Sequence, residues 1–297
     1  MMLLGKNEVR KEFPELEESI LGEESNKFTN KLGNCLTVEV KDTMEDTKEL
    51  LVKVLDNNQI AASLLAQQVH AEVSLDTNTL EGQSCDLECS LDDLAVWIDP
   101  IDATSQYING GEGYDEEGLP IKGLPVVTVL LGAFLKSSGA PVLGVVNQPF
   151  AAGGGRQHWS VRTSEQGWLH SLLPQPNSRT RPLLLIGSSE SPQLLKELSE
   201  HWRIVRAGGA GHKLLMVSLG LADLYVNTGP STFQWDTCAP HALLDATGGG
   251  LLDCRGKQIR YSTNKETAAN SEGVVAFRAG MDEEAFSLIR QINVLKE

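Results

Sequence analysis

One short segment restricts the fold of this chain more than any other feature. Residues 94–98 form a continuous apolar run, which is typical of a strand buried on both faces. Asp99 follows at once, and Pro100 predicts a turn that brings the carboxylate of Asp102 back beside it. Two adjacent carboxylates repel each other unless a cation lies between them, and oxygen ligands favour Mg²⁺. The segment therefore predicts a metal site, with an ordinary turn in which Asp102 caps a helix as the alternative.

The residues after Asp102 suit an anion. Ala103 and Thr104 begin a predicted helix, and the N–H groups at a helix start bind anions. A divalent cation beside such a group is what hydrolysis of a phosphate ester requires. The formal net charge of −15 argues against nucleic acid and anionic membranes as partners. A phosphorylated small molecule is repelled too, unless metal ions or a local lysine reverse the sign in its pocket.

Three other segments are ambiguous when taken singly. Glu23 and Glu24 lie in an acidic stretch, which usually marks a solvated surface. Asp236 begins an apolar-faced helix, where an aspartate ordinarily caps. A glycine-rich turn over residues 207–211 precedes Lys213. Its backbone N–H groups and the ammonium would suit an anion, although an exposed lysine after a tight turn is the simpler interpretation.

Apolar periodicity predicts two blocks of strands and helices. The first has helices over residues 43–69, broken near residues 56–58, and strands over 126–135 and 142–147. Residues 151–180, rich in Gly and Pro, predict a linker. In the second block, the pattern predicts strands over residues 183–186, 224–226 and 274–277. It also predicts helices that begin at residues 191 and 236 and helices over residues 212–219 and 282–295. We expect an α/β (α+β) layered sandwich, with lobes over residues 1–155 and 180–297 and the site between them.

Signals for export are few. The apolar start is too short for a signal peptide, and the longest apolar stretch is about half of a membrane span. The five cysteines are scattered and odd in number, which indicates reduced thiols and a cytoplasmic location. Cys85 and Cys89 have no second pair of metal-binding residues nearby, so a flexible acidic loop is favoured over a zinc site there.

Taken in chain order, these segments resemble the lithium-sensitive, magnesium-dependent phosphatase superfamily of inositol monophosphatases, bisphosphate nucleotidases and fructose bisphosphatases. The shared pattern is an upstream Glu, an Asp-Pro-Ile-Asp-like segment and a distant Trp-Asp, here Glu23, residues 99–104 and residues 235–236. The resemblance runs over residues 13–280. The continuations after Thr104 and after Cys238 are most similar to the branch that acts on inositol polyphosphates.

The resemblance implies a monomeric, cytoplasmic enzyme of phosphatidylinositol signalling, with two or three Mg²⁺ ions per site and Li⁺ as inhibitor. It implies removal of the 1-phosphate from inositol 1,4-bisphosphate or 1,3,4-trisphosphate. One ion would be held by Glu23, Asp99 and the Ile101 carbonyl with support from Glu24, and a second by Asp99, Asp102 and Asp236. Thr104 would orient or help activate the attacking water. The implied substrate contacts are Asp102, Ala103, Thr104, Ser189, Gly209, Ala210, Lys213 and Ser231.

Two alternatives stay open. Residues 235–240 resemble the nucleotidases nearly as well, which makes 3′-phosphoadenosine 5′-phosphate the alternative substrate. The family also has an N-terminal aspartate that pairs with the threonine at the position of Thr104, whereas no Asp precedes Phe13 here, and Ser191 replaces a substrate-binding lysine. Loss of one general-base element costs about 10²–10⁴-fold in rate. The other alternative is therefore a protein with a shortened N-terminal helical region. Such a protein would be a weakened enzyme, or a non-catalytic binder of inositol phosphate or metal.

Overall fold

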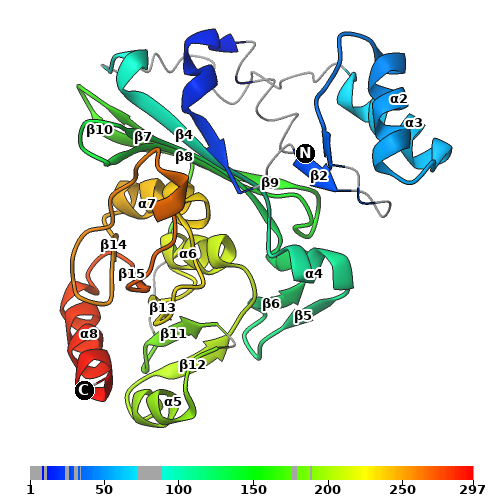
Figure 1. The fold of residues 1–297 in the computed structure, drawn as a ribbon. Coiled ribbons are helices and arrows are strands. Elements are labelled where there is room, and N and C mark those ends of the chain that lie inside the picture. Colours follow the sequence, from blue (N-terminus) through cyan, green and yellow to red (C-terminus); the bar gives the residue numbers. More distant parts are fainter. Residues whose placement is uncertain are drawn as a thin grey trace. The chain divides into compact units, whose positions relative to one another are not determined.

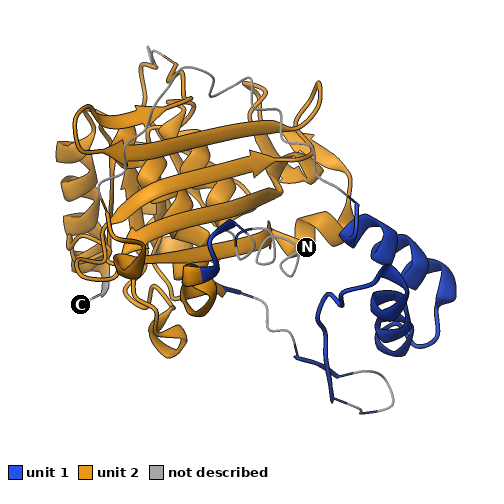
Figure 2. Cartoon of the chain, turned by 90° about the horizontal axis from the view of Figure 1, so that it is seen from above, with its two compact units in different colours: residues 1–14, 22–85 blue, residues 15–21, 86–297 orange. Residues whose placement is uncertain are grey.

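The computed structural model describes residues 9, 12–23, 27–29, 33, 35–71, 89–175, 179–187 and 189–296. The chain divides into two compact units, coloured separately in Figure 2. The first unit comprises residues 1–14 and 22–85, and the second comprises residues 15–21 and 86–297. In the described part of the chain, no helix is long and apolar enough to cross a membrane.

The first unit contains a hairpin and two helices. The hairpin pairs β2 (Lys27–Thr29) with β3 (Cys35–Thr37) in antiparallel register. The helices are α2 (Met44–Val54) and α3 (Gln59–Val69), which begin after the capping side chains of Thr43 and Asn58. The break expected near residues 56–58 is confirmed, because Asp56 and Asn57 adopt positive φ and stop the first helix.

A six-stranded sheet forms one layer of the second unit (Figure 1). The strand order is β1-β4-β7-β8-β9-β10, and each pair from β4 onward is antiparallel. The strands are β1 (Ile20–Gly22), β4 (Leu94–Asp102), β7 (Thr128–Leu135), β8 (Pro141–Gln148), β9 (Arg156–Thr163) and β10 (Gly167–His170). The linker predicted over 151–180 is wrong in this part, because β9 and β10 form a hairpin at the sheet edge.

A five-stranded sheet forms the second layer, in the order β12-β11-β13-β15-β14. The pairs β11–β12 and β11–β13 are parallel, while β15 is antiparallel to both of its neighbours. The strands are β11 (Leu183–Ile186), β12 (Arg203–Arg206), β13 (Leu224–Asn227), β14 (Gly250–Leu252) and β15 (Val274–Phe277). The strands predicted at 183–186, 224–226 and 274–277 are thereby confirmed.

Helices separate and cover the two sheets. They are α5 (Pro192–Leu198), α6 (Ala210–Ser218), α7 (Gln234–Ala246) and α8 (Asp282–Lys296). Helix α7 packs on β4, β7 and β8 and also on α6, which in turn contacts β13 and β15, so α6 and α7 lie between the sheets (Figure 1). Helix α8 contacts β15. The layered sandwich is confirmed, whereas the lobe boundaries at 155 and 180 stay a prediction.

The core has two parts, one on each side of the five-stranded sheet. The larger cluster lies around α6 and α7 and includes fully buried Trp97, Phe134 and Leu243. The smaller one is formed with α5 and α8 and includes Leu184 and Leu288. The apolar face that the sequence predicted for the helix from residue 236, which is α7, is therefore buried between layers.

Two glycines let α7 approach the six-stranded sheet at backbone distance. Gly132 on β7 and Gly144 on β8 are cross-strand partners. A Cβ at Gly132 would lie 2.4 Å from the backbone nitrogen of Ala239, and one at Gly144 would lie 2.2 Å from the Ala239 carbonyl oxygen. Since neither position has room for a side chain, backbone contact sets how deeply α7 lies on the sheet.

Short elements complete the second unit. Among the described residues, 3-10 helices span Pro14–Ser19, Leu91–Asp93, Leu124–Val126 and Lys265–Thr267. Helix α4 (Thr104–Asn109) follows β4 directly, and a small hairpin of β5 (Glu112–Tyr114) and β6 (Pro120–Gly123) comes after it.

Candidate metal centre

Three buried aspartates meet where β4 ends and α7 begins. Each of Asp99, Asp102 and Asp236 offers a carboxylate oxygen, and these oxygens lie within 4.8 Å of one another. The residues are only 2%, 5% and 8% exposed, respectively. Three carboxylates this close and this buried repel one another strongly, so the arrangement calls for a positive charge among them.

A β-bulge brings the first two carboxylates to one side. The sequence predicts that β4 ends near Asp99, but the strand continues through Pro100 to Asp102 with a shift of register. Asp99 pairs with Leu130 and Asp102 with Thr128. Because Leu130 and Thr128 are two positions apart, they face the same side of β7. Their partners on β4 therefore do so as well, which three steps of regular strand would not achieve.

Asp236 caps α7 and also joins the cluster. Its Oδ2 accepts a hydrogen bond from the backbone N–H of Phe233 at 2.6 Å, so the capping role considered for it is present. The ring of Phe233 stacks on Trp235 with centroids 4.5 Å apart, and Trp235 contacts Trp97 on β4 at 5.6 Å. These aromatic contacts fix the start of α7 against the strand that carries the other two aspartates.

Asp102 receives three hydrogen bonds. The Thr128 hydroxyl and the Gly211 N–H each donate to Oδ2 at 3.0 Å, and the Ala210 N–H donates to Oδ1 at 3.3 Å. Burial raises the pKa of Asp102, and the charge of Lys213 and these hydrogen bonds oppose that rise. Residue types alone do not single out Thr128 or Gly211. The Thr128 contact becomes visible only once the register pairs it with Asp102.

Lys213 holds the glycine turn in place. Its ammonium is buried and donates to the carbonyl oxygens of Ala207 at 3.1 Å and Gly209 at 2.7 Å, over the ring of Tyr225. Burial lowers its pKa to about 8, while Asp102 and Asp236 act in the opposite direction. The lysine is thus not the exposed side chain of the simpler interpretation. Its predicted contact with substrate stays a prediction.

Gly209 is required by the turn itself. Its φ is +69°, which L side chains rarely adopt, and a Cβ there would lie 2.9 Å from Oδ2 of Asp102. Ala210 follows as the first residue of α6. These two predicted substrate contacts therefore lie directly beside the aspartate cluster.

The segment after Asp102 is held in an unusual conformation. Ala103 has φ of +66° and precedes α4, a backbone geometry that is costly for a non-glycine residue. The Thr104 hydroxyl donates to the Ile101 carbonyl at 3.0 Å, and the Ile101 N–H donates to Oδ1 of Asp99 at 2.9 Å. Thr104 and Ile101 are thereby tied to the cluster through one chain of hydrogen bonds.

The structure describes most of the other residues that the sequence singled out. Ser231 donates to Oδ1 of Asn227 at 3.1 Å after β13, and Ser189 follows β11. Glu23 is exposed and belongs to the first unit, so its role as a ligand stays a prediction. Glu24 and Cys85 lie outside the described residues. Ser191, where the family pattern has a lysine, caps α5 by accepting the Leu194 N–H at 3.2 Å.

The donor set fits a hard divalent cation. Asp99, Asp102 and Asp236 offer carboxylate oxygens, with no nitrogen or sulfur in the cluster, and oxygen ligands of this kind suit Mg²⁺. The Ile101 carbonyl lies two residues beyond Asp99 and can accept a ligand besides the Thr104 hydroxyl, because a carbonyl oxygen has two lone pairs. The chemistry open to such a centre is hydrolysis of an anionic ester.

Comparison with known sequences identifies relatives over most of the chain. The profile of the inositol monophosphatase family matches residues 12–292. The mouse inositol polyphosphate 1-phosphatase is 35% identical over 92% of this chain and 79% of its own length, and the human one is 34% identical over 95% and 81%. The mouse 3′(2′),5′-bisphosphate nucleotidase 1 is 34% identical over 62% of this chain and 58% of its own.

Solved structures of the same fold exist at lower identity. A Pyrococcus horikoshii protein described as similar to inositol-1 monophosphatase aligns with a TM-score of 0.50 at 16% sequence identity. The alignment covers 67% of this chain and 70% of that one. At this identity the likeness concerns the fold alone, which agrees with the layered arrangement of the second unit.

Proposed function

The chain belongs to the inositol monophosphatase family, and on that premise we propose that it is a Mg²⁺-dependent phosphomonoesterase that removes the 1-phosphate of inositol polyphosphates. Inositol 1,4-bisphosphate and inositol 1,3,4-trisphosphate are the proposed substrates. The observation that carries the proposal is the convergence of Asp99, Asp102 and Asp236 from two distant segments, with ligand oxygens within 4.8 Å.

The ligands divide between two ions in this proposal. Asp99, Asp102 and Asp236 hold one, and Glu23, Asp99 and the carbonyl of Ile101 hold another, with support from Glu24. When bound, Mg²⁺ lowers the pKa of a coordinated water and neutralises charge on the phosphoryl group. Li⁺ is the proposed inhibitor.

The chain's own residues position substrate and water. Ala103 and Thr104 bind the scissile phosphate through N–H groups that have no acceptor within the first turn of α4, and the Thr104 hydroxyl orients the attacking water. Gly209 and Ala210 contact the inositol, since their turn adjoins Asp102. Lys213, Ser189 and Ser231 are proposed as further contacts. A monomer in the cytoplasm is the proposed form.

Two sets of relatives favour different substrates. The inositol polyphosphate 1-phosphatases match nearly the whole chain, whereas the nucleotidase match covers 62% of it. We therefore place the inositol polyphosphates first and an adenosine bisphosphate second. The second candidate has its own support, because the nucleotidase match is 34% identical over its span, close to the 35% of the mouse inositol polyphosphate 1-phosphatase.

Phosphate release tests the proposal directly. The assay compares inositol 1,4-bisphosphate, inositol 1,3,4-trisphosphate and 3′-phosphoadenosine 5′-phosphate, with Mg²⁺, with EDTA, and with Mg²⁺ plus Li⁺. We expect release from the inositol phosphates that needs Mg²⁺ and falls with Li⁺. Asp236→Asn should lower it by about 10²-fold or more, because a ligand charge is lost.

The control substitution is Asp282→Asn at the start of α8, an exposed position that removes the same charge. It should leave the rate unchanged. Preference for the adenosine bisphosphate would transfer the assignment to the nucleotidase activity. Binding of inositol 1,4-bisphosphate without release of phosphate from any substrate would refute the enzyme and favour a binding protein.

A further inference from the structure

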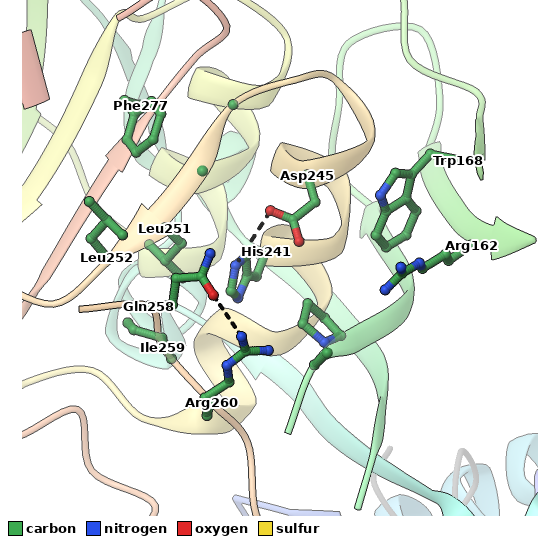
Figure 3. Close-up of a pocket in the computed structure, with 14 residues that line it drawn as sticks. Arg162, Trp168, His241, Asp245, Leu251, Leu252, Gln258, Ile259, Arg260 and Phe277 are labelled. Carbon is green, nitrogen blue, oxygen red and sulfur yellow. Dashed lines mark hydrogen bonds and ion pairs between the residues drawn. The ribbon is translucent and has the colours of Figure 1, made fainter. Parts of the chain in front are cut away.

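A second cavity lies at the far end of α7 from the aspartates. It has a volume of about 460 Å³ and is lined by β9, β10, the C-terminal half of α7, β14 and residues 258–260 (Figure 3). Asp236 and Asp245 are about 13 Å apart along the axis of α7, at about 1.5 Å per residue. None of the three clustered aspartates lines the cavity.

Two arginines and a tryptophan face this cavity from different strands and loops. Arg162 and Trp168 project from β9 and β10 on one side, while Arg260 projects from the opposite side beside Gln258 (Figure 3). Arg260 donates one hydrogen bond to Oε1 of Gln258. In the described residues neither guanidinium lies within ion-pairing distance of a carboxylate, so each has N–H groups to offer a ligand.

One carboxylate, Asp245, and one neutral histidine form the acidic side of the cavity. Burial raises the pKa of Asp245 to about 6, against the opposing charges of Arg162 and Arg260. His241, whose Nε2 lies 3.5 Å from Oδ1 of Asp245, has its pKa lowered to about 3, mainly by burial, and its ring is neutral. The two guanidinium groups therefore set a positive sign in the cavity of a strongly acidic protein.

Besides these charged groups, apolar side chains form part of the walls. Trp168, Leu251, Ile259 and Phe277 line them. A planar guanidinium fork recognises oxyanions by paired hydrogen bonds, and an aromatic or aliphatic body fits beside the apolar side chains. A metal cation would suit Asp245 and the negative end of α7, but it would meet two positive charges.

We infer that this cavity is a binding site for a small organic oxyanion, held by Arg162 and Arg260 and packed against Trp168, separate from the aspartate cluster. Phosphate monoesters and carboxylates share the required chemistry. The size is within the range of about 300–1,000 Å³ that is usual for small-molecule sites.

Calorimetric titration in EDTA tests this site without metal at the aspartates. The probes are phenylphosphonate, whose C–P bond is not hydrolysed by a phosphomonoesterase, and phenylacetate. We expect saturable binding of at least one of them, and the better binder identifies the oxyanion type. Arg162→Gln and Arg260→Gln should each weaken binding by about tenfold. Both side chains are exposed, and circular dichroism would verify the fold of each variant.

Arg156→Gln is the matched control, because Arg156 begins the same strand as Arg162 but does not line the cavity. It removes the same charge and should leave the affinity unchanged. Binding should also persist in Asp236→Asn, which separates this site from the proposed function. Wild-type affinity in both cavity variants, loss of binding in Asp236→Asn, or no saturable binding of either probe up to about 10 mM would each overturn the inference.

Discussion

Neutralising one carboxylate of the cluster should stabilise the protein without metal and reduce the stabilisation that metal provides. Asp236→Asn removes the repulsion between this residue and both Asp99 and Asp102. With oxygens within 4.8 Å, each pair of charges costs about 3 kcal/mol at an effective dielectric constant of about 20. Asn keeps an oxygen that can accept the Phe233 N–H, so the cap of α7 survives.

Several effects reduce that figure. The ammonium of Lys213 loses a favourable interaction with Asp236, and burial raises the pKa of Asp102, so that proton binding there relieves part of the repulsion. We expect a net stabilisation of about 2 kcal/mol in EDTA, which raises the melting temperature by about 3 °C in a protein of 297 residues, because the entropy of unfolding is about 2.1 cal/mol/K per residue. With Mg²⁺ at about 100 times its Kd, the wild type gains about 2.7 kcal/mol, and the variant gains much less.

Thermal unfolding followed by circular dichroism, in EDTA and then in MgCl₂, measures both effects as differences in melting temperature between the variant and the wild type. Asp282→Asn serves as the control, because it changes the net charge equally at an exposed position. The reasoning is refuted if Asp236→Asn lowers the melting temperature in EDTA, or if Mg²⁺ stabilises the variant as much as the wild type.

Three further outcomes follow from single positions. Gly209→Ala should cost about 1–2 kcal/mol, through its positive φ and the contact with Asp102, and should lower phosphate release; denaturant unfolding that shows no loss would contradict this. Gly144→Ala should destabilise by about 3 kcal/mol by displacing α7 from the sheet. Gly153→Ala, where a Cβ meets nothing within 4 Å and only the positive φ opposes a side chain, should cost about 1 kcal/mol. Because the pKa of Asp245 is raised to about 6, the folded state binds a proton more tightly than the unfolded chain does. Stability should therefore fall by about 1–2 kcal/mol as pH rises from about 4 to about 6, since solvent screens part of the full effect. Asp245→Asn should flatten this change in urea unfolding, and an unchanged slope would exclude the assignment.

The sequence predicts those elements whose signals are local. Thr43 and Asn58 are good helix caps, and Asp56 and Asn57 tolerate positive φ, so α2 and α3 and the break between them could be predicted. The hairpin of β9 and β10 could not, because glycines and prolines flank it and exposed, half-buried and buried residues follow one another in its strands without strict alternation. Such strands lack the apolar alternation on which the prediction depends.

The site divides in the same way. The segment around Asp99 predicted a carboxylate pair. It predicted that a turn brings the two carboxylates together, whereas a bulge in β4 does so. The joining of Asp236 to that pair came from the resemblance to a family, since no local pattern links residues this far apart. The inward direction of Lys213 and the hydroxyl of Thr128 depend on packing and register, which a single sequence does not contain.

The paired glycines at positions 132 and 144 have a consequence for how this centre tolerates change. A helix that packs on side chains shifts when those side chains are substituted. At Gly132 and Gly144 no side chain lies between α7 and the sheet, so the distance between their backbones cannot change in this way. Asp236 lies about one helical turn from that contact at Ala239, so the backbone contact also fixes the distance between Asp236 and the aspartates on β4. Apolar residues elsewhere in the layers can therefore be substituted without changing the distances among Asp99, Asp102 and Asp236.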